Sequence, residues 1–489
     1  MVKLHVPDLF IYRWRYAFGY ITIGLGCLIL LFVASLYIPG GLSEREVSAV
    51  TTANNLSIKH FQPDMVINLP YYLTQKAGFY LFGLSEFSIK LPTIILGALL
   101  VLGLVLLLKV WFKRNVAVLT AIVGIAAGPF LLAAQSGSPG ILYIFWPTWL
   151  IYTAAVIARR PSFPILWKTL FFILVALSLY TPLSLYVVIA LVSAALLHPH
   201  LRHVVRSLSK FRIIVTLLVA SVFLIPLAYS LYRQPSLALT LLGIPASLDV
   251  WANLHQLFSQ YLDVVHPSNG TIMTPVYEVA SLMLACVGIY RIVTAKYTAR
   301  SYILICWLIF LIPVLVVNPS LINVTFLPFL LLTGYGIDFL IRYWYRLFPR
   351  NPYARVVGLV PIVILITTLT LSGLDRFVYG YLYNPSAARQ ASSDLAILAS
   401  EFRHPPKEPV TLIVTPDEQA FYSAVRRYNP EWNIHEVTTS YPPASASSTV
   451  IASRGIRDSA TPTTLPTKIL SSPLSNQADR FYIYKNPSQ

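Results

Sequence analysis

The segment Pro39-Gly-Gly-Leu-Ser-Glu-Arg-Glu-Val47 opens a loop that closes with Leu81-Phe-Gly-Leu-Ser-Glu-Phe-Ser-Ile-Lys-Leu-Pro92. Apolar runs flank this loop at 17–38 and 91–112, and each has about the 20 residues that a helix needs to cross a bilayer. The loop, residues 39–90, is therefore predicted to connect the first two transmembrane helices at the membrane surface. Because it brings acidic and basic side chains to that surface, we expect it to form the reaction centre.

The composition of the whole chain predicts a membrane protein. Of its 489 residues, 56% are hydrophobic and only 11% are charged, which leaves too little polar surface to cover soluble cores. We expect an all-α polytopic domain in residues 1–374, with about 11 transmembrane helices and a large first outer loop. The predicted spans are 17–38, 91–112, 116–134, 141–157, 165–180, 182–197, 211–231, 274–294, 301–317, 324–342 and 355–374.

The distribution of lysine and arginine predicts the orientation of these spans, because short cytoplasmic segments of membrane proteins carry an excess of both residues. With a cytoplasmic N-terminus, 20 of the Lys and Arg residues before position 375 fall inside and 5 fall outside. An odd number of spans then places the C-terminus outside, as in a multi-pass protein of the plasma membrane. The same distribution accounts for most of the net charge of +17, so no nucleic-acid partner is predicted.

A second domain is predicted in residues 375–489, where proline, serine and threonine become frequent and apolar runs shrink to strand length. Its predicted elements are two strands, 410–415 and 481–484, and two helices, 394–402 and 417–428. These elements indicate a small α/β domain on the outer side of the membrane. The Ser/Thr/Pro-rich segment 438–475 is predicted to be a long loop.

Two glutamates stand near the start of the outer loop. Ser43-Glu-Arg-Glu46 has the capping-box spacing, in which the serine and the glutamate each bond the other's backbone amide. A short helix is therefore predicted from residue 44 to about residue 57. Glu46 is either the capping partner or a catalytic base, whereas Glu44 satisfies no capping requirement. A carboxylate at the mouth of a membrane cavity can take a proton from an acceptor hydroxyl, so Glu44 is the preferred base, with a solvated surface glutamate as the alternative.

A second short helix is predicted at 71–82. Pro70 suits its start and Gly83 suits its end. Tyr72 and Lys76 are one turn apart and therefore lie on one face of this helix. Lys76 either pairs with a phosphate group or extends its ammonium group into the membrane interface.

The order of these motifs resembles the first outer loop of the polyprenyl-phosphate-sugar-dependent membrane glycosyltransferases with the C-type fold. It is most similar to the branch that contains protein O-mannosyltransferases and lipid A aminoarabinose transferases. The match covers about 50 residues, and its matching positions are Ser43-Glu44, Pro70, Tyr72, Leu81-Phe-Gly83, Ser85-Glu-Phe87 and Lys90-Leu-Pro92. The resemblance implies a sugar donor on a polyprenyl phosphate, a lipid, glycan or protein acceptor bound from the outer face, and inversion at the anomeric carbon.

The chain departs from this family at two places. The family usually has Asp-Glu where this chain has Ser43-Glu44, and the aspartate lies near the reacting centre. Either Glu44 or Glu46 therefore takes the role of the base, or the protein is inactive. Asn68-Leu69 stands where the family often has His or Lys next to proline. Asp64 could compensate as a second acidic group or a metal ligand, or it could simply initiate a turn, and the need for a divalent metal ion stays open.

The remaining binding candidates are spread over the outer side. Lys76 and Arg233 are the preferred partners of the donor phosphate. Lys90 occupies the family's basic-Leu-Pro position, and it also suits an anchor at the end of a span. Glu278 lies a few residues into the eighth predicted span, where a carboxylate is costly and marks a functional candidate. The stretch 233–273 has apolar residues at helical spacing, which predicts a helix that either lies in the membrane interface or packs within the outer part.

Two other functions stay open. A transporter or flippase for a lipid-linked glycan would need polar residues along several spans, but Glu278 and Asp338 are the acidic residues within the predicted ones. A catalytically inactive relative that serves as a binding partner is suggested by Ser43 and Asn68, where polar chemistry of the family is missing.

Overall fold

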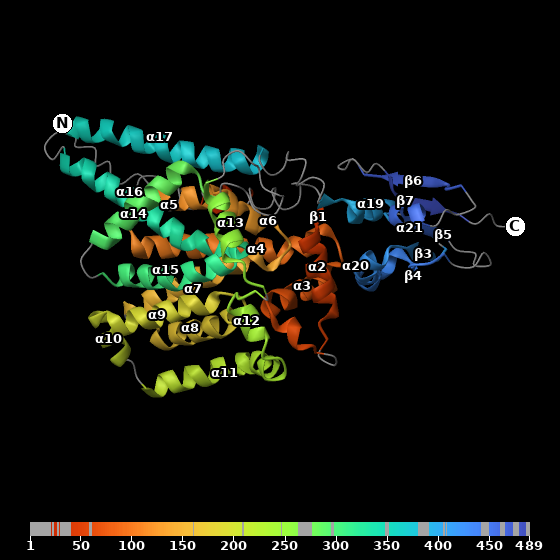
Figure 1. Cartoon of the computed structure of the whole chain (residues 1–489), viewed down its shortest axis with the longest axis horizontal. Helices are drawn as coiled ribbons and strands as arrows, with labels where there is room; N and C mark the ends of the chain where they lie inside the picture. Colours follow the sequence, from red (N-terminus) through yellow and green to blue (C-terminus); the bar gives the residue numbers. More distant parts are fainter. Residues whose placement is uncertain are drawn as a thin grey trace, which may run out of the picture.

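The computed structural model shows a mostly helical membrane part with a small sheet domain at one end (Figure 1). Apart from residues 21, 24–26 and 29, the first predicted span lies outside the described residues. The structure describes those five positions and residues 41–57, 61–159, 161–207, 210–245, 247–262, 276–294, 298–347, 352–379, 391–403, 406, 408–441, 449–459, 465–472 and 479–485.

Six helices within these ranges are long and apolar enough to cross a membrane, so the chain is an integral multi-pass membrane protein. Two bent helix pairs raise this number to eight if each pair forms one span. The six are α4 (Glu86–Trp111), η3 with α7 (Pro139–Ala158), α11 (Lys210–Arg233), α15 (Ala299–Val317), η4 with α16 (Pro319–Leu347) and α17 (Pro352–Phe377). The bent pairs are α5 (Arg114–Ala126) with α6 (Gly128–Gln135), and α9 (Ser184–Leu197) with α10 (Pro199–Arg206).

Every predicted span from 91–112 onward falls on a helix, but not every helix has the length of a span. α8 (Pro164–Ser178) and α14 (Val279–Thr294) are shorter apolar helices. The chain bends by 58° between α5 and α6, where Gly128-Pro129 follows the break. Proline has no amide hydrogen for the helix ladder, and its ring would clash with the carbonyl four residues back in a continuous helix, which explains why the ladder is interrupted at the extended residue Ala127.

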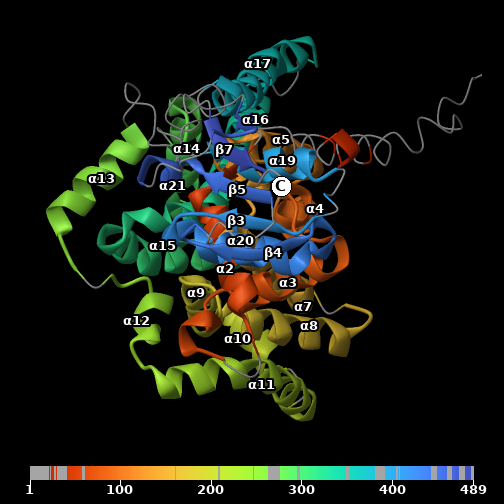
Figure 2. The same ribbon diagram turned by 90° about the vertical axis from the view of Figure 1, so that its right-hand side faces the viewer.

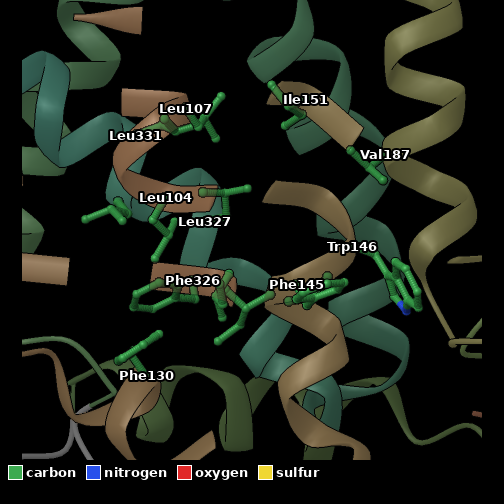
Figure 3. Packing of buried hydrophobic residues seen from close by; sticks show 14 of the residues in the cluster. Leu104, Leu107, Phe130, Phe145, Trp146, Ile151, Val187, Phe326, Leu327 and Leu331 are labelled. Atoms are coloured by element: carbon green, nitrogen blue, oxygen red, sulfur yellow. The ribbon is translucent and has the colours of Figure 1, made fainter. Parts of the chain in front are cut away.

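The membrane helices pack around one apolar core, which Figure 3 shows from close by. Leu104 and Leu107 of α4 lie next to Leu327 and Leu331 of α16, and Phe130 of α6 lies below Phe326. Leu104, Leu107, Leu327 and Leu331 are all fully buried. The bent helix α6 is therefore fixed against the same core as the long helices.

The helices α14 and α16 approach each other most closely at two glycines. A Cβ atom on Gly288 would lie 2.0 Å from the carbonyl oxygen of Leu332, and one on Gly336 would lie 2.2 Å from that of Leu284. Only residues without a side chain allow two backbones to approach so closely, as in other helix pairs within membranes. We therefore expect these two helices to move as one body.

The two helices predicted in the outer loop are confirmed. α2 (Glu44–Asn55) begins with the predicted capping box. α3 (Leu69–Phe82) starts two residues before its predicted position and ends at Gly83, which has φ +69°. Glycine is favoured there because it adopts left-handed conformations without steric cost. Between these helices lies the short 3₁₀ helix η2 (Pro63–Val66).

The stretch after α11 contains α12 (Leu237–Leu241) and the predicted helix, α13 (Val250–Leu262). One side of α13 packs on the membrane core through Leu257 and Tyr261. Its other side exposes Trp251 and Phe258. The helix lies at the margin of the molecule (Figure 2). An exposed aromatic face beside a packed one is typical of a helix at a membrane interface.

The C-terminal sheet has the strand order β4-β3-β5-β7-β6. β3 (Val410–Ile413) runs parallel to both β4 (Ile434–Thr438) and β5 (Thr449–Ser453), whereas β7 (Asp479–Tyr484) runs antiparallel to β5 and to β6 (Lys468–Ser471). The predicted strands and helices of this region are confirmed as β3, β7, α19 (Asp394–Glu401) and α20 (Pro416–Tyr428).

The predicted long loop at 438–475 is wrong. Its described part contains β5, α21 (Arg454–Ser459) and β6. The strand Thr449-Val-Ile-Ala-Ser453 is buried at every position, because it pairs on both sides in the middle of the sheet. A short buried strand has no polar alternation, so the serine, threonine and proline residues around it dominated the sequence pattern.

The outer loop and the C-terminal domain share one hydrophobic core. Leu42, Val50, Phe79 and Leu84 of the loop pack with residues of α19, α20 and the sheet. In addition, β1 (Leu42–Ser43) pairs with β2 (Ala391–Ser392) in a two-stranded antiparallel sheet. Figure 1 shows α2 directly beside α20.

Candidate functional site

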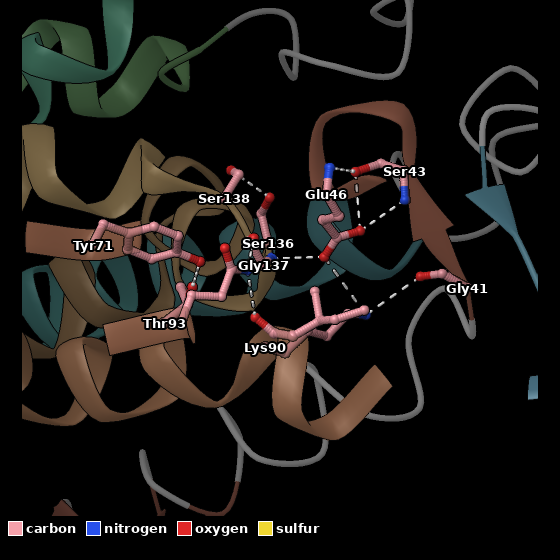
Figure 4. A network of polar contacts seen from close by, with 11 residues as sticks. Gly41, Ser43, Glu46, Tyr71, Lys90, Thr93, Ser136, Gly137 and Ser138 are labelled. Carbon is pink, nitrogen blue, oxygen red and sulfur yellow. Dashed lines mark hydrogen bonds and ion pairs between the residues drawn. The ribbon is translucent and has the colours of Figure 1, made fainter. Parts of the chain in front are cut away.

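The side chain of Glu46 is the centre of a buried polar network (Figure 4). Its Oε2 accepts hydrogen bonds from the Ser43 amide at 2.7 Å and the Ser43 hydroxyl at 3.0 Å. Its Oε1 accepts one from the Gly137 amide at 2.6 Å and lies 4.0 Å from the Nζ of Lys90. Three hydrogen bonds and one ion pair therefore engage both oxygens of this carboxylate, in a residue that is only 4% exposed. These contacts explain Glu46 as a structural residue.

The partner of this carboxylate, Lys90, is buried as well. Its Nζ donates to the Gly41 carbonyl at 3.4 Å, and the residue is only 2% exposed. The Glu46–Lys90 pair therefore joins the start of α2 to the start of α4. Removing one member of a buried pair leaves an uncompensated charge in the interior, so we expect the loss of either side chain to destabilise the folded protein.

Three further hydrogen bonds lie beside this network (Figure 4). The Nε2 of Gln75 donates to the Ile89 and Gly137 carbonyls, each at 3.1 Å, and the Tyr71 hydroxyl bonds that of Thr93 at 2.8 Å. Gly137 has no space for a side chain, since a Cβ atom would lie 2.8 Å from the Cγ2 of Ile89. The turn after α6 is thus locked between α2, α3 and α4.

Glu44 differs from Glu46 in every one of these respects. It is exposed, and it is the first residue of α2. Within the described part of the chain, no hydrogen bond or ion pair engages its carboxylate. The capping box already uses Ser43 and Glu46. Glu44 therefore has an exposed carboxylate that is not used to hold the fold together, as does Asp64 in the same loop.

Arg45, next to this glutamate, is a residue that the sequence reasoning missed. It is exposed, and it lies within electrostatic range of Tyr143 at the N-terminal end of α7. Tyr72 is also within electrostatic range of Tyr143. Arg45 and Thr52 lie on the same face of α2, and Thr52 is next to the Tyr72 hydroxyl. Burial raises the pKa of Tyr72, so this hydroxyl stays protonated and can donate a hydrogen bond. The signal in the sequence was a basic residue directly after Glu44, the preferred acidic residue.

Lys76 lies at the other end of α2. Its Nζ donates to the carbonyls of Leu56 and of Asn54, the latter at 3.4 Å, and so satisfies the C-terminal end of the helix. Burial lowers the pKa of Lys76, opposed by Tyr80 and reinforced by Arg427. A helix of 12 residues is roughly 18 Å long, and Lys76 and Glu44 lie at its opposite ends. The two groups are therefore too far apart to act on the same bond of a substrate.

This position gives a testable expectation for Lys76. Lys76→Met keeps the aliphatic stem but removes the cap, so we expect a loss of stability of roughly 0.5–1 kcal/mol with a donor KM within about threefold of wild type. Thermal unfolding in detergent and donor titration measure the two quantities. A rise in donor KM of about tenfold or more would instead support the predicted phosphate contact.

Within the described part of the chain, no hydrogen bond or ion pair joins the other predicted site residues to Glu44. Arg233, at the end of α11, is exposed, and its Nε donates to the Tyr229 hydroxyl at 3.2 Å. Asp64 is exposed within η2, where its carbonyl accepts from the Ile67 amide, as in a turn. Glu278 precedes α14 and lies beside Ser372 and Arg376 of α17. Within the described ranges, no group of three or more His, Cys, Asp or Glu side chains could hold a metal ion.

Comparison with solved structures shows the fold. ArnT, the aminoarabinose transferase from Cupriavidus metallidurans, bound to undecaprenyl phosphate, matches with a TM-score of 0.50 and 12% identity over 95% of this chain and 98% of that one. The oligosaccharyltransferase from Archaeoglobus fulgidus in its apo form matches with a TM-score of 0.50 and 13% identity over 89% of this chain and 66% of that one. No protein-family model and no curated protein matches. The chain has the fold of these membrane glycosyltransferases, as the resemblance of the outer loop implied.

Proposed function

We propose that this protein transfers a sugar from a polyprenyl-phosphate-linked donor to a lipid, glycan or protein acceptor on the outer face of the membrane. The observation that carries the proposal is the free carboxylate of Glu44 beside Arg45, on a loop that a buried network holds rigid. The bound undecaprenyl phosphate of ArnT supports a lipid-linked donor. In the proposed topology, about 11 spans place the N-terminus in the cytoplasm and both the loop and the C-terminal domain outside.

The proposed chemistry is a single displacement. Glu44 takes the proton of an acceptor hydroxyl, and the acceptor oxygen forms a bond to the anomeric carbon. The bond from that carbon to the phosphate oxygen breaks, and the electron pair leaves with the polyprenyl phosphate. Attack from the face opposite the leaving group inverts the anomeric centre. The proton stays on Glu44 until solvent removes it.

The leaving phosphate gains negative charge in this step, and Arg45 is the proposed group that stabilises it. An arginine in the first turn of a helix is unfavourable toward the helix dipole, and a bound anion offsets this cost. Tyr143, which lies within electrostatic range of both Arg45 and Tyr72, is a proposed hydrogen-bond donor for the phosphate oxygens, and Tyr72 is the second.

Replacing Arg45 with glutamine is therefore expected to lower kcat/KM for the donor by about 10- to 150-fold, since a hydrogen bond to a charged group contributes about 1.5–3 kcal/mol. Arg45→Lys should retain part of the activity, because the charge remains. Arg426→Gln, at an exposed position of α20, is the matched control. Equal kinetics of Arg45→Gln and wild type would exclude the phosphate contact.

Purified protein in lipid nanodiscs, supplied with a panel of polyprenyl-phosphate sugars and candidate acceptors, tests the function directly. Release of free polyprenyl phosphate together with a glycosylated acceptor is the expected result. The second candidate is an inactive relative that acts as a binding partner, which is favoured by Ser43 because that residue supplies only a helix cap. Tight donor binding without any transfer would support this second function.

A further inference from the structure

Asn429 joins the C-terminal domain to the outer loop with two hydrogen bonds. This asparagine follows the end of α20 and is 3% exposed. Its Nδ2 donates to the Leu84 carbonyl at 2.8 Å, and the Leu84 amide donates to its Oδ1 at 2.7 Å. One side chain thus satisfies both backbone polar groups of one residue in the turn between α3 and α4.

The turn itself is shaped for this contact. Gly83 has φ +69°, and a Cβ atom there would lie 2.8 Å from the Oδ1 of Asn429. The Leu84 side chain is 1% exposed within the core that the loop shares with α20. Phe79 and Tyr80 of α3 contact the ring of Tyr428, with centroid distances of 5.4 and 5.2 Å. Apolar packing therefore surrounds the two hydrogen bonds and keeps water from them.

The same domain also contacts both ends of α2. At the start, β1 pairs with β2 in the residues directly before Glu44, and a Cβ atom on Gly41 would lie 2.8 Å from the Ser392 carbonyl oxygen. At the end, Arg427 reaches the Asn54 side chain at 3.4 Å and the Tyr80 hydroxyl at 3.5 Å. An isolated helix of this length is marginal in water, so external contacts decide where α2 lies.

The contacts at the two ends belong to one rigid unit. Arg480 of β7 donates through Nε to the Oδ1 of Asp394 at 2.7 Å, at the first residue of α19. Its guanidinium group also lies 3.7 Å from Glu418 in α20. The segment that pairs with β1 and the helix that carries Asn429 are therefore fixed to the same sheet.

We propose that the C-terminal domain is a positioning element for Glu44, and that Asn429 is the positioning residue through which it holds the outer loop. The inference rests on the proposed function, since Glu44 is the base in that reaction. Asn429 touches no substrate. It sets the fraction of molecules in which α2 presents Glu44 to the acceptor, so its loss lowers kcat while the donor KM stays constant.

Hydrogen exchange of the full chain in nanodiscs tests this coupling without any substrate. Asn429→Ala is expected to raise the exchange of the amides in α2 and in 84–90 at least tenfold, while β3 and β5 keep their protection. The matched control is Asn433→Gly, which removes an asparagine whose Nδ2 donates to Pro406 and Glu408 within the C-terminal domain. Glycine is chosen because Asn433 has φ +52°.

Asn429→Asp separates the loss of these two hydrogen bonds from a general loss of stability, because only the former should depend on pH. A protonated carboxyl group can donate to the Leu84 carbonyl and accept from the Leu84 amide as the native amide does, whereas a carboxylate repels the carbonyl. The amides of α2 in this variant should exchange as slowly as in wild type at about pH 5, and as fast as in Asn429→Ala at about pH 8. The ratio of the α2 exchange rates between Asn433→Gly and wild type should not change with pH.

The inference is overturned if α2 exchanges equally in Asn429→Ala and wild type, or if Asn429→Asp shows no pH-dependent change in α2. Failure of the proposed function gives a different result. In that case wild-type protein transfers no sugar from any donor, but the exchange experiment still reports whether the domain holds the loop.

Discussion

Glu44→Gln is expected to lower the rate of sugar transfer by about 10²- to 10⁴-fold, which is the usual contribution of a general base. Glutamine has nearly the same shape but cannot accept the proton of the acceptor hydroxyl. Because Glu44 is exposed and the capping box uses Ser43 and Glu46 instead, the fold should not change. Single-turnover transfer from a polyprenyl-phosphate sugar measures the rate, and thermal unfolding in the same detergent checks the fold.

The control for this variant is Glu436→Gln, the same chemical change at an exposed position of β4. It should transfer sugar at the wild-type rate. If Glu44→Gln keeps a rate within about twofold of wild type, the assignment of the base is wrong. If it moves a lipid-linked glycan across the membrane as fast as wild type and neither protein transfers sugar, the protein is a transporter.

Glu46→Leu is expected to reduce stability by about 3–5 kcal/mol, because it leaves the Lys90 ammonium group buried without a partner. The two side chains are only 5% and 3% exposed, so water does not replace the lost carboxylate. The same change removes the acceptor for the Gly137 amide. The midpoint of thermal unfolding at a fixed detergent concentration measures this loss, and inactivity of the variant would then follow from misfolding.

The double variant Glu46→Leu, Lys90→Met separates charge from hydrogen bonding. Removing both charges should recover a large part of the loss, while the unpaired amides of Ser43 and Gly137 keep a cost of about 1–3 kcal/mol each. Glu401→Gln is the control, since Glu401 and Lys468 form an exposed ion pair at 2.5 Å. Its effect should stay below about 1 kcal/mol. Equal losses in the single and double variants would argue against a buried charge pair.

Local patterns in the sequence predicted the local structure of the site. The spacing of Ser43 and Glu46 gave the capping box, and Pro70 and Gly83 marked both ends of α3 to within two residues. These features depend on residues within one helical turn, and backbone hydrogen bonding decides them without help from the rest of the chain.

Contacts between distant residues were beyond such patterns. The Glu46 carboxylate accepts a hydrogen bond from the amide of Gly137, which is 91 positions away in the sequence. The Leu84 amide donates to the side chain of Asn429, which is 345 positions away. Lys76 shows the difference most clearly. Its place on the face of Tyr72 was correct, but its partner is the end of α2, which only the packing of the two helices brings within reach. Sequence reasoning assigned charges to the outside but could not determine which of them were already paired.

The bend at Gly128-Pro129 sets the point from which α6 begins, and the Gly137 amide that donates to Glu46 follows two residues after the end of this helix. The number of residues in α6 therefore determines where this amide lies. One inserted residue would rotate the following backbone by about 100° and advance it by about 1.5 Å, which moves this amide away from the carboxylate. The hydrogen bond to Glu46 therefore depends on the length of segment 128–137. Its residue types can change wherever the core accepts them, but its number of residues is fixed by a carboxylate on another helix.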